Sequence, residues 1–234
     1  MSYNVFKNIF NKRDIGKTET AINMLFITFS GGLQDAYSYM VRGGVFANAQ
    51  TGNIVLMGQK IVNMDFAGWL KYFFPVMSFA MGVFAAENLS AWVPKFGKMS
   101  WRQIILIFEV ILLFIVSFMP PSYNNIANAV VSFSCAMQLQ AFRQINGHAF
   151  ASTMCIGNLR SGVEALSIWV RTKDVLSMER SLHYFFVIAV FATGAGTGAA
   201  FADVLGGKLI LVSCVLLLAS FFLMFEEQEP KSDF

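Results

Sequence analysis

Apolar residues gather into six long runs along this chain. A helix needs about 20 mostly apolar residues to cross the hydrocarbon core of a bilayer, and each run is close to this length or longer. Turn-forming residues such as Pro120-Pro121 and Gly206-Gly207 stand between the runs. The pattern predicts an all-α integral membrane protein with helices over Ala21–Val41, Phe66–Val93, Trp101–Met119, Ile126–Ile145, Leu182–Phe201 and Lys208–Phe225.

Two further apolar segments, Phe46–Val62 and Phe150–Val170, are interrupted by polar residues. Backbone that is not helical is tolerated at membrane depth only where protein or water satisfies its polar groups. We therefore expect two re-entrant or broken helices folded into the bundle. The alternative is that both segments cross, which gives eight spans arranged as 4+4. The interrupting residues include Asn48, Gln50, Thr51, Asn53, Asn158, Arg160 and Glu164.

The two interrupted segments indicate an internal repeat. Each contains a Gly-Asn pair, Gly52-Asn53 and Gly157-Asn158, in nearly the same relative place. Shifting the chain by the distance between the pairs lays the first apolar run on the fourth and the third on the last, although residue identity is low. The predicted organisation is a tail at 1–20, a first repeat at 21–119, a second repeat at 120–225 and a tail at 226–234.

The positions of Lys and Arg favour six spans. With three spans in each half the halves lie inverted, and the N-terminal tail, Lys95–Arg102 and Arg171–Arg180 all face the cytoplasm. With eight spans, Lys95–Arg102 falls outside. Because cytoplasmic loops carry an excess of Lys and Arg, we expect a 3+3 inverted repeat in the cytoplasmic (inner) membrane, with both termini in the cytoplasm.

The composition agrees with this picture and excludes several functions. The chain is 56% hydrophobic and only 13% charged, whereas soluble domains carry about 25% charged residues. A net charge of +3, scattered along the chain, does not suggest nucleic-acid binding. The expected partners are the lipid bilayer and a small-molecule or ion solute, and a homo-oligomer is compatible. Cysteines and histidines form no CxxC or HExxH pattern, so neither a metal nor a cofactor is expected.

The stretch from Gly31 to Asn53 is the most informative. It places Asp35 in the first span, then the glycine pair Gly43-Gly44, then a segment of small and amide residues. Ionisable residues within spans are costly and are functional candidates by default. A Thr51-Gly52-Asn53 break could offer backbone and amide groups to a solute, or its small residues could merely let helices approach closely.

This stretch resembles the signature of the YoaK-type family, a group of uncharacterised bacterial multi-spanning membrane proteins. The likeness rests on Gly32 and Asp35, the Gly-Gly-x-Phe turn ending at Phe46, and Thr51-Gly52-Asn53. The second half, with Gly157-Asn158 followed by Glu164, resembles the family's second Gly-Asn segment, with Ile156 where the family usually has Thr. The resemblance implies the membrane fold and no established activity.

Other intramembrane charges have both functional and structural interpretations. Arg143 could pair with Asp35 across the repeat, or either could meet a solute. Arg160 and Glu164 stand four residues apart and could pair on one helix face. Glu109 interrupts a continuous apolar run, so it must face the bundle or be protonated; it is a candidate proton-linked acid. In the glycine-rich run that follows Thr193, Gly194 and Gly198 are expected to pack helices.

Transport of a small solute, by a carrier or a channel-like protein, is the function expected first. The candidate path residues are Asp35, Asn48, Gln50, Thr51, Gly52, Asn53, Arg143, Gly157 and Asn158. A non-transporting membrane assembly or sensor component is the alternative. An intramembrane enzyme is expected least, because the chain has no GxSxG elbow, no HExxH and no convincing nucleophile–base spacing.

Overall fold

The computed structural model describes residues 21–92, 99–145, 148–149 and 155–226. Regular structure in these ranges is helical, except that β1 (Gln144–Ile145) pairs antiparallel with β2 (His148–Ala149). The all-α fold class is therefore confirmed. The helices are α2 (Ala21–Met40), α3 (Gln50–Val62), α4 (Phe66–Trp92), α5 (Trp101–Val116), α6 (Asn124–Ala141), α7 (Cys155–Thr172), α8 (Val175–Leu205) and α9 (Ile210–Glu226), with the short 3₁₀ turns η1 (Pro121–Tyr123) and η2 (Gly206–Leu209).

Each of the six predicted apolar runs overlaps one helix: α2, α4, α5, α6, α8 or α9. The predicted helix that ends at Ile145 is too long, because α6 ends at Ala141 and Gln144–Ile145 form β1. The largest difference is at α8, which begins at Val175, well before the apolar run does. The Asp174 side chain caps this start by accepting hydrogen bonds from the amides of Leu176 and Ser177, so a polar turn is added to the helix. The predicted tail at 1–20, the loop residues Lys95 and Lys98, and nearly all of the tail at 226–234 lie outside the described residues.

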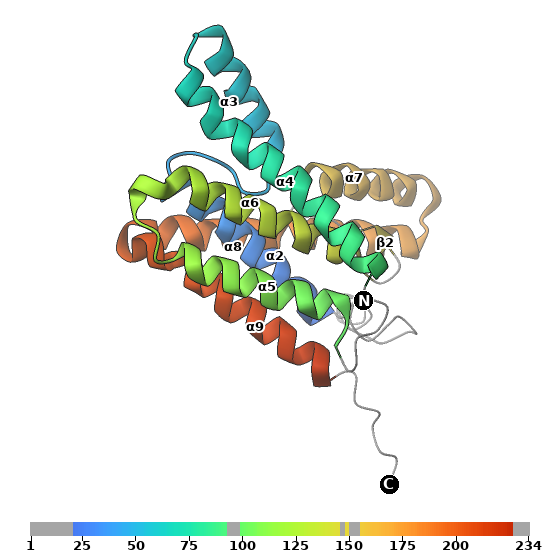
Figure 1. The fold of residues 1–234 in the computed structure, drawn as a ribbon. Coiled ribbons are helices and arrows are strands. Elements are labelled where there is room, and N and C mark those ends of the chain that lie inside the picture. Colours follow the sequence, from blue (N-terminus) through green and yellow to red (C-terminus); the bar gives the residue numbers. More distant parts are fainter. Residues whose placement is uncertain (1–20, 93–98, 146–147, 150–154, 227–234) are drawn as a thin grey trace.

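The long helices form one bundle, and the two interrupted segments lie at its periphery. α2 packs against α8 and α9, α6 packs against α4 and α5, and α5 packs against α9. The shorter helix α3 packs on α4, and together with the start of α4 it projects from the bundle, whereas α7 packs on α8 (Figure 1). The two peripheral helices thus each extend along a different long helix.

The crossing of α2 and α8 depends on a close approach of the two backbones. A Cβ at Gly194 would run into the main-chain carbonyl of Phe29, and one at Gly198 would collide with the Ala36 side chain. The prediction that these two glycines pack helices is confirmed, since only a residue without a side chain fits at Gly194.

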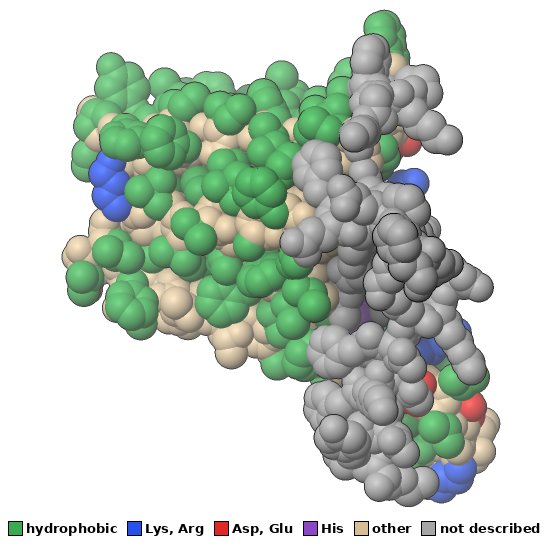
Figure 2. Space-filling model, turned by 90° about the horizontal axis from the view of Figure 1, so that it is seen from below, with side chains coloured by type: hydrophobic (Ala, Val, Ile, Leu, Met, Phe, Trp, Pro, Cys, Tyr) green, Lys and Arg blue, Asp and Glu red, His purple; other side chains and the backbone are tan. Residues whose placement is uncertain are grey.

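The surface of the bundle is rich in apolar side chains. Two described stretches, Phe66–Trp92 and Val175–Met224, are long and apolar enough to cross a membrane by length and composition; the second contains α8 and most of α9, which η2 connects. Only 22% of the apolar window in Phe66–Trp92 is buried, whereas the core helix of a soluble protein is mostly buried. Figure 2 shows hydrophobic side chains across one face, with Lys and Arg towards its two ends. These features agree with membrane association.

Candidate functional site

Five polar side chains from three helices meet inside the bundle. We call them the Glu109 cluster, and none of them is more than 1% exposed. α2 contributes two of its members, α5 contributes the acid, and α6 contributes the other two. The members are Ser30, Gln34, Glu109, Cys135 and Gln138.

The carboxyl group of Glu109 is held by two glutamine amides. Gln34 Nε2 donates to Oε1 at 3.1 Å, and Gln138 Nε2 donates to Oε2 at 2.9 Å. In the described part of the chain the only ion pair joins Lys60 to Asp65, so no cation there neutralises Glu109. A buried carboxylate without a cation is costly even when its oxygens are hydrogen-bonded. The burial of this acid therefore costs free energy that its two hydrogen bonds only partly offset.

The Gln34 amide extends the cluster beyond Glu109. Its Nε2 also donates to Ser30 Oγ at 3.0 Å, and its Oε1 accepts from the Cys135 thiol at 2.6 Å. A single amide thus joins an acid, a hydroxyl and a thiol. The arrangement can hold a proton or a small polar ligand, but it has no nucleophile–base pair of the kind that hydrolases use.

Asp35 lies one position further along α2 and faces the start of α3. Its Oδ1 accepts the Asn48 main-chain amide at 2.7 Å. α3 begins at Gln50 with no side-chain cap and no acid in its own first turn. Because a helix N-terminus carries partial positive charge, Asp35 supplies the anion that α3 lacks. Cys155, the first residue of α7, is also close enough to interact electrostatically with Asp35, so both short helices begin near this carboxyl group.

The Thr-Gly-Asn segment is bonded to the loop before it. Asn53 Oδ1 accepts the Phe46 amide at 3.0 Å, and Asn53 Nδ2 donates to the Phe46 carbonyl at 2.7 Å and to Gln50 Oε1 at 2.8 Å. A Cβ at Gly52 would lie 2.9 Å from the Phe46 ring, so any other residue there would have to displace that ring. We call this unit the Phe46 clamp. Thr51 is exposed beside it, and the clamp itself has a structural role.

The remaining predicted path residues are scattered. Asn48 Nδ2 reaches the Gly31 carbonyl at 3.4 Å, and Gln50 Nε2 donates to the Ala47 carbonyl at 2.8 Å. In the second segment Gly157 is exposed and Asn158 is buried. α3 packs on α4 and α7 on α8, so the two Gly-Asn pairs sit on helices with different packing partners.

The predicted ion pairs do not form among the described residues. Arg143 follows the end of α6 and is exposed, and no ion pair joins it to Asp35. Arg160 and Glu164 are both exposed on α7, again without an ion pair between them. Asp35 instead takes its hydrogen bond from the backbone at the start of α3.

A scan of family models matches residues 23–223 to a family described as a protein of unknown function, DUF1275. The match covers most of the chain. The protein belongs to the DUF1275 family. This agrees with the resemblance to the YoaK-type family noted from the sequence. No curated protein matches the chain, and neither does any solved structure.

Two central residues of this DUF1275 protein, Gln34 and Gln138, escaped the sequence analysis. Their signal is a second alignment of the halves, one position away from the spacing of the Gly-Asn pairs. With Phe29 laid on Phe133, the segment TFSGGLQ ending at Gln34 matches the segment SFSCAMQ ending at Gln138. Amide side chains do not stand out in a hydropathy pattern. An alignment that follows the Gly-Asn pairs is displaced by one residue from the alignment that matches Gln34 with Gln138.

Arg42 was also missed, because it stands directly after an apolar run, where a basic residue usually lies at the membrane surface. It is only 2% exposed. Its guanidinium donates to the carbonyls of Val116 and Met119, at the end of α5, at 2.8 and 2.9 Å. It also donates to the Tyr37 hydroxyl at 2.7 Å and to Asn124 Oδ1 at 3.1 Å. A cation bonded to the last carbonyls of a helix is favourable, so Arg42 ties one end of the bundle together.

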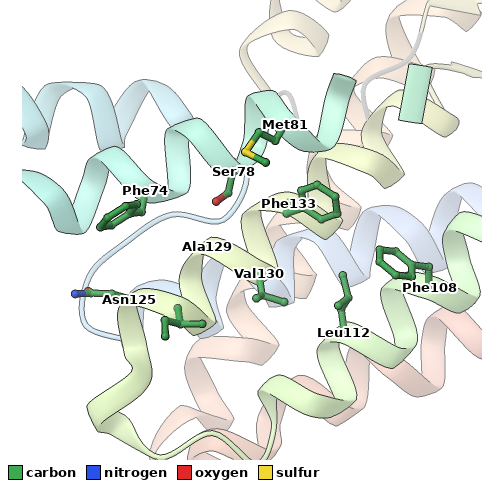
Figure 3. Close-up of a pocket in the computed structure, with 10 residues that line it drawn as sticks. Phe74, Ser78, Met81, Phe108, Leu112, Asn125, Ala129, Val130 and Phe133 are labelled. Carbon is green, nitrogen blue, oxygen red and sulfur yellow. The ribbon is translucent and has the colours of Figure 1, made fainter. Parts of the chain in front are cut away.

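An apolar pocket of about 370 Å³ lies between α4, α5 and α6. Figure 3 shows Phe74 and Met81 on α4 facing Phe133 on α6 and Phe108 on α5 across it. Ser78 and Asn125 are the only polar residues of its lining. The pocket suits an apolar chain better than a polar solute, so it does not replace the Glu109 cluster as the candidate site.

Proposed function

We propose that this protein is a multi-spanning protein of the cytoplasmic membrane that moves a small solute, as a transporter or a channel-like protein. The observation that carries the proposal is Glu109, an acid buried with two glutamines at the centre of a bundle with an apolar surface. Ionisable residues in the interior of membrane bundles mark ion and substrate pathways by default.

The proposed topology has six spans, with α3 lying on α4 and α7 on α8 at the periphery of the bundle, neither of them crossing. α3 has 13 residues, which span about 20 Å at 1.5 Å per residue, short of the about 30 Å of a hydrocarbon core. α7 exposes Arg160 and Glu164, which lipid would not accommodate. The spans are then α2, α4, α5, α6, α8 and α9, with both termini in the cytoplasm.

The packing of the helices supports a 3+3 inverted repeat. In the proposed repeat α2, α3, α4 and α5 correspond to α6, α7, α8 and α9. The α2–α8 contact then corresponds to α6–α4, the α2–α9 contact to α6–α5, and the α3–α4 contact to α7–α8. All of these contacts are present. α5 and α9, the last helices of the two halves, pack against each other and run in opposite directions (Figure 1). Antiparallel equivalents are what an inverted repeat requires.

Equivalent residues make equivalent contacts in the two halves. A Cβ at Gly82 on α4 would meet the Phe133 carbonyl on α6, and a Cβ at Gly194 on α8 would meet the Phe29 carbonyl on α2. Phe29 and Phe133 are the residues aligned above, so the two glycine crossings are counterparts. This pair of contacts argues for duplication more strongly than residue identity does.

Glu109 stands where the proposed halves meet. The segment ILIFEVILL that contains Glu109 aligns with ILVSCVLLL, which places Cys214 at its equivalent position. The Cys214 thiol donates to the Val110 carbonyl at 3.7 Å, so the two positions lie close together. The glutamines that hold the acid, Gln34 and Gln138, are themselves equivalents. Transporters built from inverted repeats bind their solutes at such an interface, near the bilayer midplane.

Flux into liposomes tests the proposal. Purified full-length protein would be reconstituted and assayed with protons, potassium, chloride, glycerol and neutral amino acids as probes. We expect the wild type to move at least one probe and Glu109→Gln to lose most of that flux. Glu87→Gln is the matched control, because Glu87 also bonds a glutamine, Gln140, but on the exposed surface. Equal flux in all three proteins would remove Glu109 from the mechanism.

The Phe46 clamp favours the alternative, a non-transporting membrane assembly or sensor component. Gly52 and Asn53 are occupied by contacts within their own segment, and so they offer little to a passing solute. Co-purification of a stoichiometric partner, with no flux of any probe, would support this alternative over transport.

A further inference from the structure

We infer that Glu109 is a reversible proton-binding site, in which the Gln34 side-chain amide turns over when the proton binds. The inference deepens the proposed function by naming a proton as one ion bound at that site. It rests on which groups surround the Gln34 amide and on what each of them can donate or accept.

The structure satisfies the ionised form of Glu109. Each carboxylate oxygen accepts one amide N–H, from Gln34 and from Gln138. The Gln34 carbonyl oxygen faces the Cys135 thiol, which donates to it. In this arrangement the Gln34 nitrogen faces the two acceptors, Ser30 and Glu109, and its oxygen faces the one donor, Cys135.

The same set of groups also satisfies the neutral form. A proton on Glu109 Oε1 is a donor, so Gln34 must present its carbonyl oxygen instead of its amide nitrogen. A half-turn of the Gln34 amide achieves this and directs its N–H groups towards Cys135. The Ser30 hydroxyl and the Cys135 thiol can each either donate or accept, so both keep a bond to Gln34 after the turn. Gln138 continues to donate to the other oxygen.

No described charge locks Glu109 in one state. The titratable groups facing it are thiols, Cys135 on α6 and Cys214 on α9, both of which interact electrostatically with it. Asp35 on α2 acts on Cys135 as well, and it adds negative charge to the region. Among the described residues no cation is within ion-pair distance of Glu109. Burial in a membrane favours the neutral form of Glu109, and the two amide donors favour its ionised form. These opposing effects allow the proton to bind and dissociate.

Infrared difference spectroscopy tests this inference on the full-length protein in lipid nanodiscs as the pH is varied. A protonated carboxyl group has a C=O stretching band that a carboxylate lacks. We expect such a band to appear on acidification, to be absent from Glu109→Gln, and to remain in Asp35→Asn and in the surface control Glu87→Gln. Labelling wild-type glutamate with ¹³C at the side-chain carboxyl must shift the band, which assigns it to a glutamate even if Glu109→Gln does not fold, and the Glu87→Gln control excludes the surface acid.

The role of Gln34 has its own readout. Gln34→Leu removes a donor that favours the ionised acid, and hydrogen bonds to charged groups are the stronger ones. The band should then persist to higher pH, with a midpoint raised by about one pH unit or more. Cys135→Ser keeps a group that both donates and accepts, and should leave the midpoint close to that of the wild type. A purely structural Gln34 would lower stability in Gln34→Leu without moving the midpoint.

A band of constant intensity across the pH range, or no band assignable to Glu109, would overturn the inference. Because the titration needs no flux, its outcome is separate from that of the transport assay. Titration without flux would indicate a pH-sensing membrane protein, and flux without titration would indicate transport that does not bind a proton at Glu109.

Discussion

Replacing Asn53 by alanine should destabilise the protein even though the residue belongs to a motif that resembles a solute path. The Asn53 side chain is fully buried and makes three hydrogen bonds, two to the Phe46 main chain and one to Gln50. Each such bond contributes about 1 kcal/mol net, and the substitution strands a main-chain donor and acceptor. We therefore expect Asn53→Ala to lower the free energy of unfolding by about 3 kcal/mol.

The assay is equilibrium unfolding in mixed micelles of dodecyl maltoside and sodium dodecyl sulfate, followed by tryptophan fluorescence. Asn63→Ala is the matched control, because Asn63 is exposed at the other end of the same helix, and it should stay within about 0.5 kcal/mol of the wild type. If Asn53→Ala were as stable as this control and yet changed solute flux, Asn53 would be a path residue and the Phe46 clamp would not have a structural role.

Three further features of the structure can each be tested by substitution. In Arg42→Lys the lysine cannot reach all four acceptors of the guanidinium, so the free energy of unfolding should fall by about 3 kcal/mol in the same assay. A variant as stable as the wild type would show that Arg42 does not hold this end of the bundle together. Gly194→Ala should destabilise the α2–α8 crossing, whereas Gly196→Ala, where a Cβ meets only open space, should be neutral or mildly stabilising; equal effects would refute the close approach. The hydrogen bond from Lys60 holds the pKa of Asp65 below the ordinary aspartate value of 3.8. A lowered folded pKa means that its stabilisation is present above pH 3.8 and is lost as the pH falls through the folded value. The protection factors of amides in the α3–α4 turn, which correct for the intrinsic pH dependence of exchange, should therefore fall on acidification, and Lys60→Met should remove most of that change.

The helices were largely predictable because length and hydropathy decide them. α2 ends at Met40 and α4 at Trp92, each one residue from the end of the predicted run. There are two exceptions: α6 ends before its apolar run does, and α8 begins with polar turns that depend on the cap at Asp174 and not on hydropathy. Glu109 was also predictable, since an acid in a continuous apolar run has to be accommodated by its neighbours.

The partners of Glu109 were not predictable, because they depend on tertiary packing. Nothing in a linear pattern says that Gln34 and Gln138 turn towards the same acid. The Asp35–Arg143 pair was predicted from the repeat register that the Gly-Asn pairs define. The fold instead brings the backbone just before α3 to Asp35. The Phe46 clamp shows a similar limit, because small and amide residues at a chain break are equally suited to a ligand and to the loop next to them.

The central claim is that two inverted halves meet at Glu109, and membrane topology tests it most directly. Single cysteines would be placed at Ser100, before α5, and at Ser122, before α6, in a Cys155→Ser background, and labelled in intact cells with a membrane-impermeant maleimide. Six spans predict that position 122 is labelled from outside and position 100 only after the membrane is permeabilised. Labelling of position 100 but not 122 in intact cells would mean eight spans in two parallel halves, and it would contradict the inverted repeat.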